Sequence, residues 1–575
     1  MKESRTLNFD DVLENTLGGF GRWQFLLYVA GGLLLFPCKL YIPIFLGFLP
    51  RYRCKVLECD LEPKVEFHPT WAEFAIPHLD NNYLHDGLGH CQRFSSNGTS
   101  CSKFNFDEHH MVPCSQSVYD DSMMKEPMVA FFDIGPCSSN DPNWWLGSWI
   151  SQMAFIEIIF WTGVMIGILV CGRMGDRYGT RVVILTSQVT FTVGAIIAFT
   201  SMTYSSYVIS SLLTGFGCMG SSTSPYVLVS EVMGKNHRHY LAFYQIFRVL
   251  GGFSYAWVAS VLQNWRQFWL YALCVNLAVS PIWFWLHDSP RWLLSRGQFS
   301  QARKVLDFAT KINGEPRLSA NDFAALQEAS RQQNASNRIH ERMWTNYYVL
   351  RNLVVCLFIW LSVGLMYLGL SRISVTLGGN IYENFALFEG AELIGLVLSS
   401  TVASYMDCRT LIVWSLGSGS LALVLSFLIG HPMWTLALVV LGKTWASMSL
   451  QVIYVYTPAI FPTPIRNSAL GLSSTAARLG ALIGAWLINS KGIPIVLSLL
   501  IFAGIGLMAC TLILAFLPKI QGSALPETLQ DVKNLDRDLP VLGHLSIFDE
   551  VLPSGMDFEK ESLLKNALSQ EELLS

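Results

Sequence analysis

The 575-residue chain is poor in charged residues. Asp, Glu, Lys and Arg make up only 14% of it, whereas the average soluble protein has roughly 25%. Its 42 acidic and 39 basic residues nearly cancel, so no basic excess favours nucleic acid as a partner. Because 51% of the residues are apolar, a disordered chain and a small disulfide-rich secreted protein are also excluded.

The sequence also lacks the spacings typical of enzymes. We find no phosphate-binding loop, no paired nucleophile and base, and no zinc-ligand spacing. His109 and His110 are adjacent, but without further ligands at metal-site spacing a solvated loop is the better interpretation. We therefore expect no enzymatic activity, no cofactor and no metal.

Long apolar runs are abundant instead. A membrane span needs roughly 20 apolar residues, and the sequence contains twelve candidate runs. They lie near 23–46, 149–171, 181–201, 205–230, 241–263, 267–287, 348–370, 381–404, 410–430, 434–457, 467–488 and 493–517. The expected fold class is an all-α membrane protein with twelve transmembrane helices.

The basic residues in the connections predict the orientation. Lys and Arg gather in 172–181, 233–240 and 288–347, whereas the connections near 202–204 and 431–433 contain none. Because basic loops stay in the cytoplasm, we place both termini there, in a multi-pass protein.

The long segment 47–148 falls on the opposite, external face. It contains six cysteines, which allow up to three disulfides in an oxidising compartment. They are Cys54, Cys59, Cys91, Cys101, Cys114 and Cys137. Asn97 begins a glycosylation sequon in this segment, and we expect it to be modified.

The connection after the sixth run divides the spans six and six. We therefore expect a cytoplasmic N-terminus, a six-helix bundle, a cytoplasmic helical linker, a second six-helix bundle and a cytoplasmic tail. Their bounds are 1–22, 23–287, 288–347, 348–518 and 519–575. In the linker we expect short amphipathic helices, one of them capped by Ser300.

The two halves show an internal repeat with losses in the second. Glu231 follows the fourth run and is followed seven residues later by Arg238, whereas the matching stretch after the tenth run has Ala459 and Arg466. Likewise GRMGDRYGTR (172–181) matches only YMDCRT in the second half. Ion pairs that form in one orientation and break in another bias a rocking motion. The predicted gating residues are Asp176, Arg177, Arg181, Glu231, Arg238, Asp407 and Arg466. Plain anchoring by arginine is the alternative, although it does not explain the acids.

Several motifs together resemble solute carrier family 22 of the major facilitator superfamily, the organic cation, anion and carnitine transporters. They are GRMGDRYGTR, SEVMG-x-x-x-R, DSPRWLLSRGQ, SVTLGGNIY, FPTPIRN, SSTAARLG and LPET. The resemblance implies two pseudo-symmetric six-helix halves, a place in the plasma membrane and transport by alternating access. SSTAARLG and SVTLGGN look more like the carnitine/zwitterion and orphan branches. The chain departs from the family pattern at Ala459, usually Glu, at YMDCRT, and at His287-Asp288, usually Pro-Glu.

Charged residues inside spans are costly and persist where they face a partner or a wet cavity. There are seven: Lys39, Glu157, Arg248, Glu389, Glu392, Lys443 and Arg478. The resemblance implies that Arg478 binds substrate, because anion and carnitine transporters tend to have Arg at this position. A guanidinium offers a bidentate fork to a carboxylate. The alternative is a structural ion pair of Arg478 with Glu389 or Glu392.

Glu392 and Lys443 match residues usual in the family. They are expected to complete a zwitterion site or carry a coupling proton, with a purely structural pair as the alternative. Aromatic residues in spans 4, 5, 7 and 10 are expected to line the cavity, unless they face lipid or only pack. They are Tyr226, Trp257, Trp360, Tyr367, Trp445 and Tyr454.

Two functions follow from these observations. The first is a carrier for small organic ions, carboxylate-bearing anions or zwitterions, with the lipid bilayer as its surroundings and a coupling ion left open. The second is a transport-impaired protein that acts as a receptor or as a subunit of a membrane-protein complex. The losses in the second half and the long external loop motivate the second function. A channel fits poorly, because no filter-like repeat stands out.

Overall fold

The structure is a computed structural model of the whole chain. It describes residues 9–37, 39–60, 65–77, 91–96, 98, 100–114, 116–134, 152–234, 237, 240–336, 346–375, 379–403, 405–462, 465–489, 493–520 and 532. Three predicted residues, Asn97, Cys137 and Arg238, lie outside this set. Most of the predicted tail does as well.

The first half of the bundle is built from helices that the first six apolar runs form. They are α2 (Arg22–Leu35), η1 (Lys39–Tyr41), α3 (Ile42–Leu46), α6 (Gln152–Tyr178), α7 (Thr180–Thr200), α8 (Tyr204–Val232), α9 (Tyr240–Phe243), α10 (Ile246–Leu262), α11 (Trp265–Val279) and η5 (Ser280–Trp285). The second half is formed by the last six runs. Its helices are α15 (Tyr347–Ile373), α16 (Ile381–Val402), α17 (Cys408–Ile429), α18 (Pro432–Ile460), α19 (Arg466–Asn489) and α20 (Ile495–Phe516).

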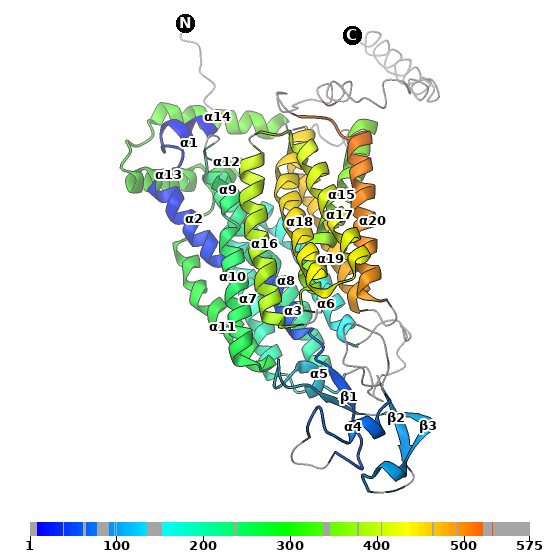
Figure 1. Cartoon of the computed structure of the whole chain (residues 1–575). Coiled ribbons are helices and arrows are strands. Elements are labelled where there is room, and N and C mark those ends of the chain that lie inside the picture. Colours follow the sequence, from blue (N-terminus) through cyan, green and yellow to red (C-terminus); the bar gives the residue numbers. More distant parts are fainter. Residues whose placement is uncertain are drawn as a thin grey trace, which may run out of the picture.

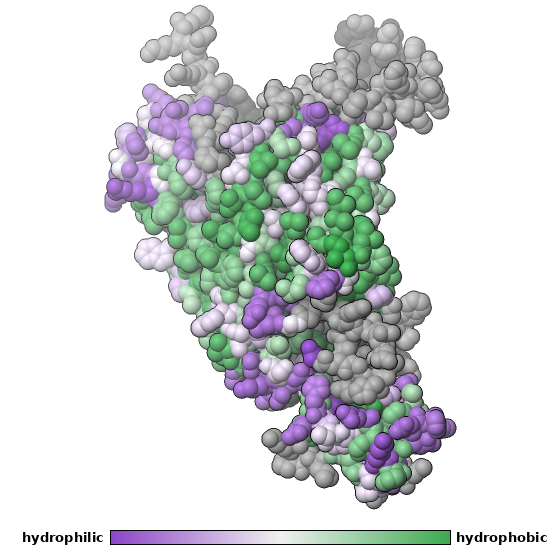
Figure 2. All heavy atoms as spheres, viewed as in Figure 1, coloured by the Kyte–Doolittle hydropathy of each residue, from purple (hydrophilic) through white to green (hydrophobic). Residues whose placement is uncertain are grey.

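Ten helical segments in the described residues are long and apolar enough to cross a membrane. The long α8 and the shorter α10 run beside them and complete the twelve predicted spans (Figure 1). On the face shown in Figure 2, hydrophobic side chains cover much of the helical bundle, and hydrophilic ones gather toward its two ends. This distribution is the one that a bilayer requires.

The first span is interrupted between α2 and η1. Pro37 lies in the break, where a proline lacks the N–H that would continue the helix. Its free carbonyl accepts a hydrogen bond from the Tyr255 hydroxyl at 3.3 Å. A break at membrane depth is tolerated when neighbouring helices satisfy the backbone, and this one turns Lys39 and Tyr41 into the bundle, where both are buried.

The two halves repeat one packing scheme. In the first half α8 packs against α6 and α7, and in the second α18 packs against α16 and α17. Across the middle, α6 contacts α19 and α10 contacts α16. The sequence order makes α6 equivalent to α16 and α10 equivalent to α19, so the two seams are related by the repeat.

Small residues allow close helix crossings in both halves. Gly215 of α8 lies against the Phe160 carbonyl of α6, and Gly480 of α19 lies against the Leu361 carbonyl of α15. A Cβ at either glycine would collide with backbone. Such crossings are common between membrane helices, because association there depends on close packing.

A helical cap covers one end of the bundle. It consists of α1 (Phe9–Asn15), α12 (Pro290–Ser295), α13 (Phe299–Asn313) and α14 (Ala320–Ser336) (Figure 1). The apolar stripe of α13, with Val305 and Leu306, is buried against residues of α1 and α2. The predicted cap at Ser300 is wrong: α13 begins at Phe299, and Gln298 is the capping residue, without a side-chain hydrogen bond. We call the end of the bundle that this helical cap covers the linker end.

The other end, which we call the loop end, carries a small β-rich unit from the segment 47–148. Its elements are β1 (Tyr52–Cys54), α4 (Ala72–Ala75), β2 (Gln92–Ser96), η2 (Lys103–Asn105), β3 (Phe106–Pro113), β4 (Ser117–Tyr119) and α5 (Met128–Phe131). Strand β1 pairs antiparallel with β4, and β2 pairs antiparallel with β3.

Disulfides tie this unit together. Cys54 is bonded to Cys114, and Cys59 is bonded to Cys101. Cys91 is disulfide-bonded as well. Five of the six predicted cysteines thus form disulfides, and the sixth, Cys137, lies outside the described residues.

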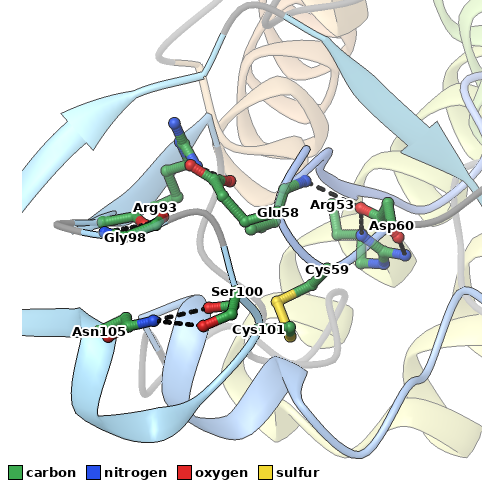
Figure 3. The surroundings of a disulfide bond; sticks show 11 residues. Arg53, Glu58, Cys59, Asp60, Arg93, Gly98, Ser100, Cys101 and Asn105 are labelled. Carbon is green, nitrogen blue, oxygen red and sulfur yellow. Dashed lines mark hydrogen bonds and ion pairs between the residues drawn. A yellow bond between two sulfur atoms is a disulfide. The ribbon is translucent and has the colours of Figure 1, made fainter.

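A buried ion pair supports the same unit. Arg53 and Asp60 are 0% and 8% exposed, and they lie beside the Cys59–Cys101 disulfide (Figure 3). Two guanidinium nitrogens of Arg53 donate to the Asp60 carboxylate at 2.6 and 2.8 Å. The Val56 amide also donates to this carboxylate, at 2.8 Å.

Replacing Arg53 by Leu should destabilise the loop unit by about 3–5 kcal/mol, because it leaves a buried carboxylate without its partner. Limited proteolysis of the purified full-length protein during heating measures the effect. Arg93→Leu is the matched control, since the Arg93–Glu58 pair is more exposed, with side-chain exposures of 22% and 19%. That change should cost about 1 kcal/mol or less. Equal effects of the two changes would contradict the prediction.

Candidate substrate-binding site

One carboxylate joins the two halves inside the bundle. Glu392 of α16 is 1% exposed. From the first half, Arg248 of α10 forms an ion pair with it, and the Tyr41 hydroxyl of η1 donates to it at 3.3 Å. From the second half, the Tyr367 hydroxyl of α15 donates at 2.5 Å, and the Lys443 ammonium of α18 lies 3.3 Å away. Elements from both halves therefore depend on a single side chain.

Lys443 is fixed by several groups of its own half. Its Nζ donates to the Ser371 hydroxyl at 2.7 Å and to the Tyr367 carbonyl at 3.1 Å. It also lies 3.4 Å from the centre of the Tyr367 ring, in a cation–π contact. For Glu392 and Lys443 the alternative to a substrate or proton site was a purely structural ion pair, and the contact between them is such a pair.

A second acid lies one turn away. Glu389 is 0% exposed and packs against Gly252 of α10. Arg248 and Lys443 are both within electrostatic range of it. Two acids and two bases thus form a nearly balanced group, as buried charges require. We call Arg248, Glu389, Glu392 and Lys443 the ion cluster.

Arg478 stands apart from this cluster. It is partly exposed on α19. Its guanidinium donates to the Ser474 carbonyl at 2.9 Å and to the Tyr454 hydroxyl at 3.4 Å. Among the described residues no carboxylate lies within ion-pair distance of it, and Glu392 is engaged by Arg248 and Lys443. The predicted alternative, a bridge from Arg478 to Glu389 or Glu392, is therefore not what the structure shows.

Three of the predicted aromatic residues gather near Arg478. Trp360 and Tyr454 meet edge to face at 4.6 Å between ring centres, and the Trp360 indole donates to Thr457 at 2.8 Å. Tyr226 of α8 is within electrostatic range of Tyr454. Tyr454 contacts the guanidinium directly and is partly exposed, as is Tyr226, whereas Trp360 is 0% exposed and supports Tyr454 from behind.

The other three predicted aromatics do not join this group, and Trp445 instead meets Trp414 edge to face at 6.2 Å between ring centres. Tyr367 belongs to the ion cluster's surroundings rather than to this group. Trp257 joins neither: it is 69% exposed and shares a face of α10 with Leu250 and Val261, which are also exposed. This apolar outer face is the side that a membrane helix turns to lipid, so the structure does not bring Trp257 to the site.

At the loop end the halves are held together by further polar contacts. Arg372 of α15 forms an ion pair with Glu157 of α6 at 3.3 Å and donates to the Gly47 carbonyl at 2.5 Å. The Tyr382 hydroxyl of α16 donates to the Met123 carbonyl at 2.5 Å. These contacts close the bundle on the loop side.

At the linker end the predicted gating residues of the first half contact α12 and its neighbours. The Asp176 carbonyl accepts hydrogen bonds from Trp292 and Arg296 at 3.0 and 2.9 Å. The Arg181 amide donates to Asp288 at 3.0 Å, and the Arg181 guanidinium stacks on Trp283. Burial raises the pKa of the Asp288 carboxyl, and the Arg181 amide partly offsets this shift.

The remaining gating residues are placed as follows. Glu231 is within electrostatic range of Arg291 and Asp176, whereas Arg177 stacks on the neighbouring Tyr178. In the second half, Asp407 caps α17 by accepting from Thr410 and also accepts from the Ile520 amide. Arg466 donates to the Phe461 carbonyl at 3.3 Å.

Sequence reasoning missed two members of this arrangement. Tyr41, which links Arg248 to Glu392, carried no signal beyond its place two residues after Lys39 in an interrupted span. Arg372 was overlooked because it falls just past the predicted end of its span at residue 370. A charge so close to an apolar run is a usable signal, since it lies at the membrane surface.

Glu392→Gln should destabilise the protein by about 3–5 kcal/mol, because it leaves Arg248 and Lys443 buried without their shared counter-charge. Chemical denaturation of the detergent-purified protein measures this. Combining it with Arg248→Met should cost less than the sum of the two single changes, as expected for groups in contact. Glu383→Gln, an exposed change on the same helix, is the control. Additive costs would argue against the ion cluster.

Comparison with known proteins agrees with this architecture. The family "Sugar (and other) transporter" matches residues 143–531. Solute carrier family 22 member 7 of Rattus norvegicus is 27% identical over 92% of this chain and 98% of its own length. The Homo sapiens organic cation/carnitine transporter 2 is 27% identical over 65% of this chain and 68% of its length.

Among solved structures, the xylose transporter XylE from E. coli in an inward open conformation has a TM-score of 0.53 at 18% identity. It covers 67% of this chain, and 89% of XylE is matched. This likeness shows the fold, and it confirms the predicted major facilitator architecture. The chain belongs to the sugar (and other) transporter family of the major facilitator superfamily, and its predicted kinship with solute carrier family 22 is confirmed.

Proposed function

We propose that this transporter carries organic ions that bear a carboxylate, as anions or as zwitterions, by alternating access. The observation that supports this most is Arg478, a partly exposed guanidinium inside the second half whose partners among the described residues are a carbonyl and a phenol hydroxyl. A cation without a protein counter-charge attracts an anionic group, and its fork matches a carboxylate.

The neighbours of Arg478 suit the rest of such a solute. Tyr454 and Tyr226 are partly exposed and offer ring surface, which binds apolar bodies by packing and a quaternary ammonium through cation–π contact. A carboxylate and an ammonium on one small molecule would satisfy both features. A carnitine-like zwitterion is therefore the solute class that we favour, in keeping with the name of one relative.

The ion cluster has a different part in this proposal. Its charges balance within the protein, so it has no net attraction for a charged solute. Because Glu392 takes contacts from both halves, the cluster instead stabilises the arrangement that is closed at the loop end. A proton or other coupling ion would act by changing the charge of this cluster.

The orientation follows from the basic connections. We place the linker end in the cytoplasm and the loop end outside, in the plasma membrane, with both termini cytoplasmic and Asn97 glycosylated. In this orientation the structure is closed to the outside, and solute reaches Arg478 from the cytoplasmic side. Tilting of the 23–287 bundle against the 348–518 bundle, with the 288–347 linker on the inner face, would open the outer route.

Arg478→Asp should reverse the preference of the protein for carboxylate-bearing over amine-only probes. The expected change in relative affinity is at least about tenfold, because the charge at the contact is inverted. Uptake into proteoliposomes and thermal stabilisation of the purified protein both measure it. Arg478→Lys, which keeps the charge but loses the fork, should show an intermediate loss. An unchanged preference in Arg478→Asp would defeat the assignment.

A second candidate function is a receptor or a complex subunit that no longer transports. It is favoured by the losses in the second half, where Ala459 replaces an acid and Asp407 is used to cap its own helix and to hold the Ile520 amide. An acid that is engaged in this way contributes less to a gate between the halves.

Ala459→Glu separates the two functions. If the carrier is slowed by the missing acid, restoring it should raise flux in proteoliposomes, whereas a protein that only binds partners should show no flux with either residue. Ala469→Glu, a buried change in the next helix, controls for the insertion of an acid. Robust flux by the wild-type protein would remove the second candidate.

A further inference from the structure

The first half contains a buried cation whose charge is balanced by no acid in the described part of the chain. Lys39 of η1 is 2% exposed. Its Nζ donates to the Ser221 hydroxyl at 2.9 Å and to the Gln188 side-chain oxygen at 3.2 Å, and it lies 4.3 Å from the centre of the Phe191 ring. In the part of the chain that the structure describes, no carboxylate lies within 4.0 Å of Nζ, the limit for an ion pair.

The groups around Lys39 still have donors to offer. Gln188 is 3% exposed, and its amide nitrogen has no hydrogen-bond partner among the described residues. The Ser221 hydroxyl uses its own hydrogen toward the Gly217 carbonyl. An ammonium has three donors and no acceptor, so Lys39 and Gln188 together present unmatched N–H groups and a positive charge. That combination suits an anion.

Lys443 provides the internal comparison. Both lysines are almost completely buried, and each lies over an aromatic ring. Lys443 has Glu392 at 3.3 Å, whereas the partners that the structure describes for Lys39, which are Gln188, Ser221 and Phe191, are neutral. Burying a charge without a counter-charge is costly, and the counter-charge that no described residue gives to Lys39 can be supplied by a ligand.

Lys39 and Arg478 approach the same place from opposite halves. Both are within electrostatic range of the Cys218 thiol of α8. Leu40, next to Lys39, packs in one cluster with Ala481, which is one turn from Arg478. Leu40 and Ala481 also line one small pocket at this interface, together with Trp161 of α6 and Leu368 of α15. The two cations therefore flank one region of the interface.

We propose that Lys39, Gln188 and Ser221 form a second anion-binding site, in the first half, that takes a carboxylate-sized anionic group. The inference rests on the proposed function, because it assigns the group at Lys39 to a solute that Arg478 holds by a first carboxylate. A solute with two anionic groups would then match one cation in each half. A small inorganic anion beside a singly charged solute has the same chemistry and is distinguished below.

The test compares paired probes on the detergent-purified full-length protein. The pairs are α,ω-dicarboxylates of four to seven carbons and their monoamides, which differ only in one charge. Thermal stabilisation against concentration gives the affinity of each. For the best chain length, the wild type should bind the dicarboxylate at least about tenfold more tightly than the monoamide, since a hydrogen-bonded charge contact is lost in the latter.

Two changes should remove this difference. Lys39→Met deletes the charge, and Gln188→Glu places a carboxylate beside Nζ that occupies the site from within. Lys39→Arg keeps the charge and should retain part of the difference. Titration with sodium chloride in the presence of the monoamide tests whether a small inorganic anion occupies the site instead. If chloride stabilises the wild type and Lys39→Met abolishes this stabilisation, the site is supported with an inorganic anion as its ligand.

The stability of the empty protein gives a second readout. Lys39→Met should raise the melting temperature, because an unmatched buried charge is removed, whereas Lys443→Met should lower it by leaving Glu392 short of a partner. A lower melting temperature in both variants would make Lys39 structural and overturn the site. Should Lys39→Met not fold, Gln188→Glu and Lys39→Arg still decide the question.

The outcomes separate this site from the proposed function. Equal affinity of the wild type for both members of every pair, without a chloride effect, would overturn the Lys39 site while leaving the role of Arg478 intact. If no probe bound and Arg478→Asp changed nothing, the proposed function itself would fail.

Discussion

The structure depends on one constraint: lipid supplies neither hydrogen-bond partners nor counter-charges, so the bundle must supply them. Glu392 shows how this is met. Its carboxylate takes Arg248 and Tyr41 from one half and Tyr367 and Lys443 from the other. The same constraint explains the break after α2, where the carbonyl of Pro37 itself accepts a hydrogen bond from the Tyr255 hydroxyl. Polar groups at membrane depth therefore show where the halves must meet.

Against this background, the cations inside the bundle fall into two kinds. Arg248 and Lys443 are matched by acids of the protein, and they hold the halves together. Lys39 lies in the first half and Arg478 in the second, and within the described residues the hydrogen-bond partners of both are neutral. The first kind is explained by structure, whereas the second is unexplained until a ligand is considered. This difference, rather than the presence of charge alone, separates a binding site from a support.

Much of the fold could be predicted from the sequence, because each span is a local pattern. All twelve apolar runs became helical segments, and their ends lie close to those expected except that α6 continues past the expected residue 171 to Tyr178. The partners of the buried charges could not be predicted in the same way. Arg248 meets Glu392 only because α10 crosses α16, and Trp257 turns outward because that crossing fixes which face of α10 lies inside. Neither fact is contained in a window of the sequence. The predicted N-cap of α13 was wrong for a local reason, since the helix begins one residue before Ser300.

The crossing of α10 and α16 also bears on how the protein would move. Glu392 belongs to the second bundle and contacts residues of both. Any tilt of one bundle against the other therefore has to replace its contacts with Arg248 and Tyr41 by contacts with water or solute. The loop-closed form is then a resting position set by chemistry rather than by shape alone. The rate at which these contacts break would then set how fast the empty protein changes orientation between transport cycles.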